Sequence, residues 1–195
     1  MMLPLLLVLI TLVIMEFAVA LFHQHIMHGI GWKWHQSHHA SHKIVHTKIA
    51  NQVNSGFVNS GFEKNDLYAL FFTIATVLLF IFSTPQSAIW WVGIGISIYG
   101  FLYAVMHDVI VHRRLPLRWQ PRNAYLRRLT KAHHLHHAVR SQEQGVSFGF
   151  LYAPPLESLH TQLRALTKTK ILTETPSCPH SDARRQADIP ASKVL

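Results

Sequence analysis

The stretch LPLLLVLITLVIMEFAVALFHQHIMH, residues 3–28, decides the fold, because a long apolar run ends where a histidine pair begins. Its first twenty residues contain one charged side chain, Glu16. As an α-helix they would extend roughly 30 Å, the hydrocarbon thickness of a bilayer. The run is long for a cleavable signal peptide and no basic residue precedes it, so we expect it to be retained. The sequence therefore predicts a membrane helix with a histidine-rich end.

Two further apolar runs follow at residues 67–83 and 88–106, and neither contains a charged side chain. The four uncharged residues between them, 84–87, suit a tight turn. Together with residues 3–22, these runs predict an all-α integral membrane helical bundle of about three to four membrane helices. The fourth would be an apolar segment around 145–156, which is too short to span a bilayer but long enough to enter its surface.

Lysine and arginine set the expected orientation of these spans. No basic residue precedes Lys33, and none lies between Lys64 and Arg113. With the N-terminus outside, three spans place all 18 basic residues on one side of the membrane. The positive-inside rule identifies that side as cytoplasmic. The histidine motifs fall on the same side, so we expect a histidine-rich cap at the cytoplasmic surface.

The net charge of +9 has a membrane explanation. Basic residues after the third run would lie beside anionic lipid head groups, and an acidic protein could use the same surface. The aromatic side chains fall in the apolar runs rather than among the basic residues, which argues against a nucleic-acid-binding protein. Cys178 is the single cysteine, so disulfides within the chain and four-cysteine iron–sulfur clusters are excluded.

Sixteen histidines occur in the chain, and ten of them form a duplicated pattern of spacings. Each copy is an H-x4-H pair followed by an H-x2-H-H triplet. The members are His23, His28, His35, His38 and His39 in the first copy, and His107, His112, His133, His136 and His137 in the second. Imidazole binds transition metals at neutral pH without adding charge, and ten ligands exceed the three or four of one zinc site. We therefore predict two metal ions rather than a set of interfacial or core histidines.

Helix geometry treats the triplets and the pairs differently. Positions i, i+3 and i+4 lie within an arc of about 100°, so each triplet presents three imidazoles on one face. Positions i and i+5 are about 140° apart, so His23 and His28 cannot easily hold one ion from a regular helix. They could reach two neighbouring ions, or converge if the helix unwinds at Gly29; the same holds for His107 and His112 without the glycine. Six histidines lie outside the repeat and are not expected to be ligands: His25, His42, His46, His134, His160 and His180.

Two carboxylates lie close to the pattern. Glu16 is seven residues before His23 and so on the same helical face. An ionisable group inside a membrane span is a functional candidate, and Glu16 could either support a ligand histidine or hydrogen-bond another helix. Asp108 could orient the adjacent His107 imidazole. The metal itself stays open, since nitrogen ligands suit iron, zinc, copper and nickel; iron would favour O2 chemistry and zinc hydrolysis.

Several segments resemble the bacterial β-carotene hydroxylases, in order and over about residues 15–156. They are Met15-Glu16, His23-x3-Met27-His28-Gly29, Gly31-Trp32-x-Trp34-His35-x2-His38-His39, Glu63-Lys64-Asn65-Asp66-Leu67-Tyr68, His107-Asp108-x2-Val111-His112, His133-x2-His136-His137-Ala138-Val139 and Val146-Ser147-Phe148-Gly149-Phe150-Leu151-Tyr152-Ala153-Pro154-Pro155. The histidine pattern alone is typical of the wider fatty acid hydroxylase superfamily, and the flanking segments narrow the resemblance. The stretch between His39 and Glu63 is longer than this family leads us to expect.

The resemblance implies a non-haem di-iron membrane monooxygenase with O2 as co-substrate and the ten patterned histidines as ligands of two iron ions. It implies hydroxylation at C3 of the β-ionone ring, from β-carotene through β-cryptoxanthin to zeaxanthin, with electrons from a ferredoxin-type donor. The expected location is the bacterial inner (cytoplasmic) membrane, where membrane lipids surround the protein and the carotenoid enters from the bilayer. Candidate lining residues, which could equally be packing aromatics, are Phe101, Tyr103, Phe148, Phe150 and Tyr152.

We expect residues 1–170 to form the membrane-embedded domain. Residues 171–195 are rich in Thr, Ser, Pro and charge without periodicity, which predicts a disordered tail. The alternatives within the superfamily are another lipid or sterol hydroxylase, a desaturase or a ketolase. A metal-binding or transport protein is a further alternative, but transporters place their ligands near the bilayer midplane, whereas this pattern lies at one surface.

Overall fold

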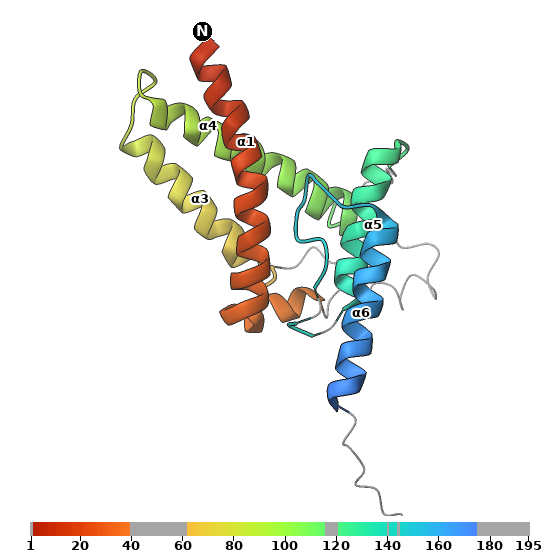
Figure 1. Ribbon diagram of the computed structural model, residues 1–195. Helices are drawn as coiled ribbons and strands as arrows, with labels where there is room; N and C mark the ends of the chain where they lie inside the picture. Colours follow the sequence, from red (N-terminus) through yellow and green to blue (C-terminus); the bar gives the residue numbers. More distant parts are fainter. Residues whose placement is uncertain (1, 40–61, 116–120, 140, 144, 175–195) are drawn as a thin grey trace, which may run out of the picture.

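The computed structural model describes residues 2–39, 62–115, 121–139, 141–143 and 145–174, and every regular element in these ranges is helical (Figure 1). The all-helical expectation is confirmed. The elements are α1 (Met2–Phe22), the π-helix η1 (His23–Ile30), a short helix at 32–39, α3 (Asp66–Ile81), α4 (Ala88–Ala104), the π-helix η2 (Val105–Val111), α5 (Ala124–Ala138) and α6 (Leu156–Glu174).

Two helices are long and apolar enough to cross a membrane, Met2–Ile30 and Ala88–Val111. The predicted second span, residues 67–83, corresponds to a shorter apolar helix, Asp66–Ile81. Large apolar side chains point outward along these helices, for example Phe17 with 67% of its surface exposed and Phe71 with 61%. Apolar surface on this scale is not left in water, so the helices indicate membrane association.

Helix α4 packs against both α1 and α3, and α5 and α6 lie side by side near the C-terminal end of α4 (Figure 1). Close approach of α1 and α4 depends on Gly95, since a Cβ there would lie 2.6 Å from the Cβ of Thr11. Helices α3 and α4 are joined by a tight turn and meet through the edge-to-face pair Phe80–Trp90, with ring centroids 4.9 Å apart. At the start of α4, Ser87 Oγ accepts the Trp90 backbone N–H and caps the helix.

Both H-x4-H pairs lie where an α-helix turns into a π-helix. In η1, the Gly31 N–H donates to the Ile26 carbonyl oxygen at 2.8 Å, and after η2 the His112 N–H donates to that of His107 at 2.9 Å. These are i→i+5 hydrogen bonds, which define the π-helix. Gly29 has non-helical backbone angles (φ −102°, ψ −119°) and breaks the helix where the sequence predicted.

The remaining elements share one apolar core. Leu129 and Ala132 of α5 pack with Leu159 of α6 and with Met106 and Ile110 of η2. Asn123 Oδ1 accepts the Leu126 N–H and caps α5. These contacts place α5 directly against the end of the second long apolar helix.

The segment from Gly145 to Pro155 contains no helix among its described residues. We call it the strap, because it runs from α5 across the end of α1 before α6 begins. The sequence predicts an apolar element around 145–156 that enters the membrane surface, and its residues Val146, Phe150 and Ala153 are buried within the protein. The predicted tail, 171–195, lies outside the described residues from 175 onward, and helix α6 continues to Glu174.

Candidate metal centre

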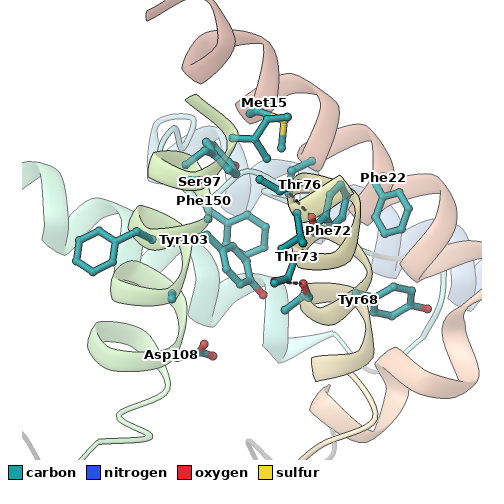
Figure 2. Close-up of a pocket in the computed structure, with 18 of the residues that line it drawn as sticks. Met15, Phe22, Tyr68, Phe72, Thr73, Thr76, Ser97, Tyr103, Asp108 and Phe150 are labelled. Carbon is teal, nitrogen blue, oxygen red and sulfur yellow. Dashed lines mark hydrogen bonds between the residues drawn. The ribbon is translucent and has the colours of Figure 1, made fainter. Parts of the chain in front are cut away.

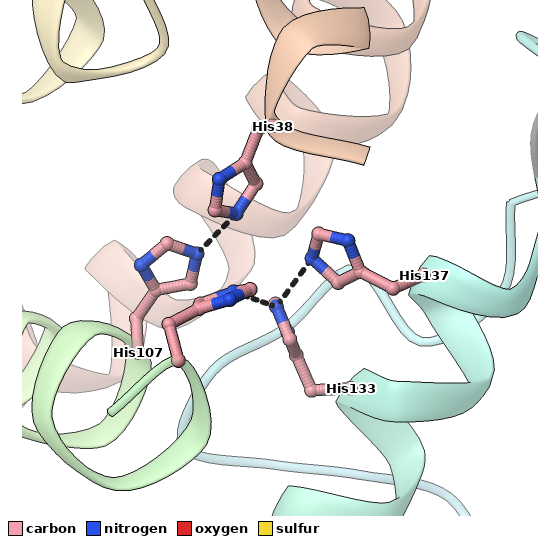
Figure 3. Close-up of side chains that lie close together, drawn as sticks. His38, His107, His133 and His137 are labelled. Atoms are coloured by element: carbon pink, nitrogen blue, oxygen red, sulfur yellow. Dashed lines mark hydrogen bonds between the residues drawn. The ribbon is translucent and has the colours of Figure 1, made fainter. Parts of the chain in front are cut away.

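The ten patterned histidines converge where α1, α4, the 32–39 helix and α5 meet, and nine of the ten are buried. The first set, which we call the His38 group, is His38, His107, His112, His133 and His137, with ligand nitrogens within 4.8 Å of one another. Figure 3 shows the labelled members of this group turned toward a common point. The second set, the His23 group, is His23, His28, His35 and His136 within the same limit, with His39 joined by a 3.1 Å contact between its Nε2 and that of His35.

Each group takes members from both copies of the sequence repeat. The outer positions of a triplet stay with the pair of their own copy, and the middle position crosses over. His38 therefore joins the second copy's histidines, and His136 joins the first copy's. On a helix, positions i and i+4 are about 40° apart while i+3 lies at the other edge of the arc, so one triplet can serve two adjacent sites.

The two members of each H-x4-H pair lie in the same group. The α-helical separation of about 140° is therefore the wrong geometry for both pairs. In the π-helices, the i→i+5 hydrogen bond stacks residues five apart along one side. His23 and His28 converge in η1, and His107 and His112 converge across η2.

Ring nitrogens inside each group face one another closely. The Nε2–Nε2 distances are 2.9 Å for His38 and His107, 3.0 Å for His23 and His35, and 3.2 Å for His28 and His136. In all six of these rings, Nδ1 lies within hydrogen-bond distance of an oxygen atom that can only accept. The ring proton is therefore assigned to Nδ1. Two Nε2 lone pairs then point at each other, an arrangement that repels unless a cation lies between them.

The oxygen atoms that fix these rings come from several segments. The acceptors are Phe148 O for His23 (3.0 Å), Gln142 O for His28 (3.1 Å), Asn65 Oδ1 for His35 (2.8 Å), Val146 O for His136 (2.9 Å), Val139 O for His39 (3.0 Å), Glu63 Oε2 for His38 (2.8 Å) and Asp108 Oδ1 for His107 (2.9 Å). Such partners set the tautomer and orientation of metal-binding imidazoles.

Burial keeps the histidines outside the long apolar helices neutral. It lowers the pKa of His35, His38, His133, His136 and His137, and neighbouring imidazoles lower each pKa further. Neutral imidazole is the form that binds metal. The donor set is therefore neutral, nitrogen-based and arranged around two points, which fits two first-row transition-metal ions.

Glu16 holds the strap rather than a histidine ring. Its carboxylate accepts the backbone N–H groups of residues 150–152 at 2.9 to 3.1 Å, and the Tyr99 hydroxyl at 2.8 Å. The strap in turn supplies the carbonyl oxygens that face His23 and His136. Between those two carbonyls, Ser147 has φ 57°, in the left-handed region, which turns both toward the His23 group.

Sequence comparison identifies relatives that are named β-carotene hydroxylases. The chain is 46% identical to the one from Pantoea ananas over 82% of each chain. It is 43% identical to the one from Paracoccus sp. (strain N81106 / MBIC 01143) over 82% of this chain and 90% of the relative, and 39% identical to that of Paracoccus sp. (strain PC1) over 88% and 98%. The chain belongs to the β-carotene hydroxylases. No protein-family model and no solved structure matches it.

In this member of the β-carotene hydroxylases, an apolar cavity of about 450 Å³ lies between α1, α3 and α4 (Figure 2). Three hydroxyl groups in its wall are hydrogen-bonded within the protein. Thr73, Thr76 and Ser97 each donate to a backbone carbonyl one turn earlier in their own helix. The cavity reaches Asp108 and Phe150 at its histidine end. It therefore offers a hydrocarbon-like space that leads from the membrane helices to the histidine groups.

Three of the five predicted lining residues, Phe101, Tyr103 and Phe150, line this cavity. The Tyr103 ring stacks on His107 at 4.8 Å, and the Phe150 ring lies 5.4 Å from His107 and 5.5 Å from His23. Phe150 thus stands between the cavity and both groups. The other two candidates lie elsewhere: Phe148 contacts the rings of the His23 group, and the Tyr152 side chain is 62% exposed.

Sequence reasoning placed Asp108 correctly beside His107 but did not assign roles to four other polar residues. Glu63 and Asn65 hold two ligand-candidate rings, and Asp66 pairs with Arg114 through two 2.7 Å contacts. Asn65 lies just before α3, and its side chain contacts His35 and makes no capping hydrogen bond to the helix. The available signal in the sequence was a Glu and an Asn placed just before an apolar run.

Proposed function

We propose that this chain is a β-carotene 3-hydroxylase that inserts one oxygen atom from O2 at C3 of the β-ionone ring. β-Carotene would be converted to β-cryptoxanthin and then to zeaxanthin. The proposal joins the family membership to the donor set, in which ten histidines hold two iron ions. When bound, the irons supply O2 activation, and the chain supplies everything else that the reaction needs.

The observation that carries this proposal is that Tyr103 and Phe150 line the apolar cavity and also contact imidazole rings of the histidine groups. A long hydrocarbon can occupy the space between α1, α3 and α4 because its wall is mostly apolar and the hydroxyls of Thr73, Thr76 and Ser97 are already hydrogen-bonded. Its ring end would meet Phe150 and Tyr103, which touch both the cavity and ligand-candidate imidazoles. These aromatic side chains would orient the ring and keep water away from the reacting carbon.

The histidines are held in the protonation state that the reaction requires. The hydrogen bond from His107 Nδ1 to Asp108 keeps that proton away from the metal-facing Nε2. Carbonyl groups of the strap do the same for His23 and His136. The chain therefore keeps the ring proton of these three histidines on Nδ1 and away from the metal-facing Nε2.

The proposal includes a membrane orientation and an electron donor. Three spans, with α3 as the second, would place the histidine groups at the cytoplasmic surface of the bacterial inner membrane. Electrons would come from a ferredoxin-type protein, whose acidic surface would meet exposed basic side chains on and beside α5 and α6. These are Arg122, Arg127, Lys131, Arg164 and Lys168.

Expression in a β-carotene-producing host, with pigments resolved by chromatography, tests the proposed reaction. Zeaxanthin and β-cryptoxanthin are expected products, while unchanged β-carotene in the presence of donor and oxygen would overturn the proposal. His23→Ala and His25→Ala form a matched pair in η1, because His23 is buried in its group and His25 is exposed. We expect His23→Ala to abolish product and His25→Ala to retain most of it. The same division should separate all ten grouped histidines from exposed His160.

The substrate cavity is tested by a second matched pair on α4. Ser97 lines the cavity, whereas Ile98 is 39% exposed on the outer face and does not line it. Ser97→Trp should fill the cavity and lower hydroxylation at unchanged iron content, and Ile98→Trp should leave both unchanged. Equal activity in the two variants would argue against this route for the substrate.

A further inference from the structure

The hydrogen-bond partners of the ring nitrogens differ between the two histidine groups. In the His23 group, all five Nδ1 atoms face uncharged oxygen atoms, four of them backbone carbonyls and one the Asn65 amide. In the His38 group, His38 donates to the Glu63 carboxylate and His107 to the Asp108 carboxylate. Two anions therefore support one group, and neutral acceptors support the other.

The Arg114 guanidinium contacts Asp108 directly and is linked to Glu63 through Asp66. Arg114 contacts both oxygens of Asp66 at 2.7 Å and Oδ1 of Asp108 at 3.3 Å. Asp66 Oδ2 also accepts the backbone N–H of Glu63 at 3.0 Å, which fixes the start of the residue that reaches His38.

The surroundings of these anions strengthen their effect. The side chains of Glu63 and Asp108 are only 15% and 30% exposed, so solvent ions screen them weakly. Beside the His23 group, Glu143 borders a polar cavity next to His28, but its side chain is exposed to solvent. The local charge therefore differs between the groups even though each contains five imidazoles.

We propose that Glu63 and Asp108 make the two metal positions unequal, so that the His38 group binds its ion more tightly than the His23 group. A carboxylate that accepts the Nδ1 proton raises the basicity of the opposite ring nitrogen. Loss of such a partner typically costs 10–100-fold in metal affinity. Glu63 is thus a positioning residue that acts through His38, and Asn65 is its uncharged counterpart acting through His35.

The inference rests on the proposed di-iron function, and the two can fail separately. The test uses full-length protein purified in detergent and loaded with 57Fe(II), measured by Mössbauer spectroscopy and by total iron. We expect two quadrupole doublets of equal area. A chelator present in limiting amount should remove the iron of the His23 group first and leave one doublet.

Two nearly isosteric substitutions assign the doublets. Glu63→Gln should shift the chelator-resistant doublet and weaken that site by about 10–100-fold, while the other doublet stays in place. Asn65→Asp should shift the other doublet and make its iron more resistant to the chelator. Because each substitution exchanges a carboxylate and an amide in one hydrogen bond, a purely structural role would not produce opposite effects on the two sites.

The possible outcomes separate the two proposals. A single doublet for two irons in the unsubstituted protein, or equal movement of both doublets in Glu63→Gln, would overturn the inequality and leave the di-iron function intact. Failure of the unsubstituted protein to hold two irons would overturn the proposed function itself. If Glu63→Gln does not retain iron in the affected site, the remaining doublet should be the one that Asn65→Asp shifts; any other result contradicts the assignment.

Discussion

The imidazoles that have a hydrogen-bond partner at each ring nitrogen share one arrangement. Their Nδ1 atoms contact an oxygen atom, and their Nε2 atoms point toward the centre of the group. The sequence alone predicts which histidines direct Nε2 toward the centre, because metal ligands must be residues with donor atoms and the histidine spacing is duplicated. It does not predict the oxygen atoms that contact Nδ1. Backbone carbonyls such as those of Val146 and Phe148 carry no residue-type signal, and any sequence of the same conformation could supply them.

Substitution of Glu16 tests how the strap is fixed. Glu16→Leu would leave the N–H groups of residues 150–152 without their acceptor, and each unsatisfied group costs about 1–3 kcal/mol. We expect a large fall in melting temperature together with loss of iron, because the strap carries the carbonyls that face His23 and His136. Glu16→Gln keeps one acceptor oxygen and should lie between the two. Tyr99→Phe removes only the hydroxyl contact and serves as the mild control; equal melting temperatures for all four proteins would contradict this role.

Acid should destabilise the metal-free protein through its buried histidines. The pKa of His133 and His136 is lowered by burial and by neighbouring imidazoles, so the unfolded chain binds more protons than the folded chain below the ordinary value of 6.5. Stability therefore rises with pH through that region and is lost as the pH falls below it. Thermal unfolding of apoprotein in detergent at pH 8, 7, 6 and 5 should show a progressively lower midpoint. A midpoint independent of pH would mean that the histidines are not buried as described.

At the scale of elements, the apolar runs and the helix-breaking residues predict most of the architecture. The helices at 66–81 and 88–104 lie within or close to their predicted ranges, because hydropathy is a local property. The π-helices could not be derived in the same way. They depend on the i→i+5 hydrogen bonds that end at Gly31 and His112, and no residue type is specific for that choice over an α-helix.

The contact between α1 and α4 provides a prediction at this scale. Gly95→Ala would bring its Cβ to 2.6 Å from Thr11 Cβ, and overpacking of this kind costs roughly 1–3 kcal/mol. Gly100→Ala, in the same helix, meets no atom within 4 Å and should gain about 1 kcal/mol from better helix propensity. Chemical or thermal unfolding in detergent should therefore rank Gly100→Ala, unsubstituted protein and Gly95→Ala in that order. Identical stability of the two variants would show that the close approach of the helices is unimportant.

For the whole molecule, the structure brings the histidine-bearing ends of the apolar helices together. The histidine-bearing ends of α1 and α4 meet Asn65 at the start of α3, so three crossing helices would put all of these ends on one side. The sequence could not show how the two copies of the repeat fit together. Exchange of His38 and His136 between the groups is a tertiary property, which depends on the placement of α5 against η2.

Reporter fusions test the proposed topology. A reporter fused after Leu195 should be active as a cytoplasmic protein, because it follows an odd number of spans from an outside N-terminus. A reporter inserted at Gln86, in the turn between α3 and α4, should report the opposite compartment. The reverse pattern, or cytoplasmic activity at both positions, would rule out three spans with the N-terminus outside.

The π-helices make the length of two short segments matter more than their composition. In these π-helices the spacing of the i→i+5 turn directs two imidazole rings toward one point. Loss of one residue would change that spacing, whereas a change of side chain would not. Deletion of one residue between His107 and His112 should abolish iron binding even though every histidine is still present. Replacing the exposed Gln24 by Ala, at constant length, should be tolerated. We therefore expect these two π-helices to tolerate substitutions of exposed residues but not insertions or deletions. The iron content of such variants would measure this directly.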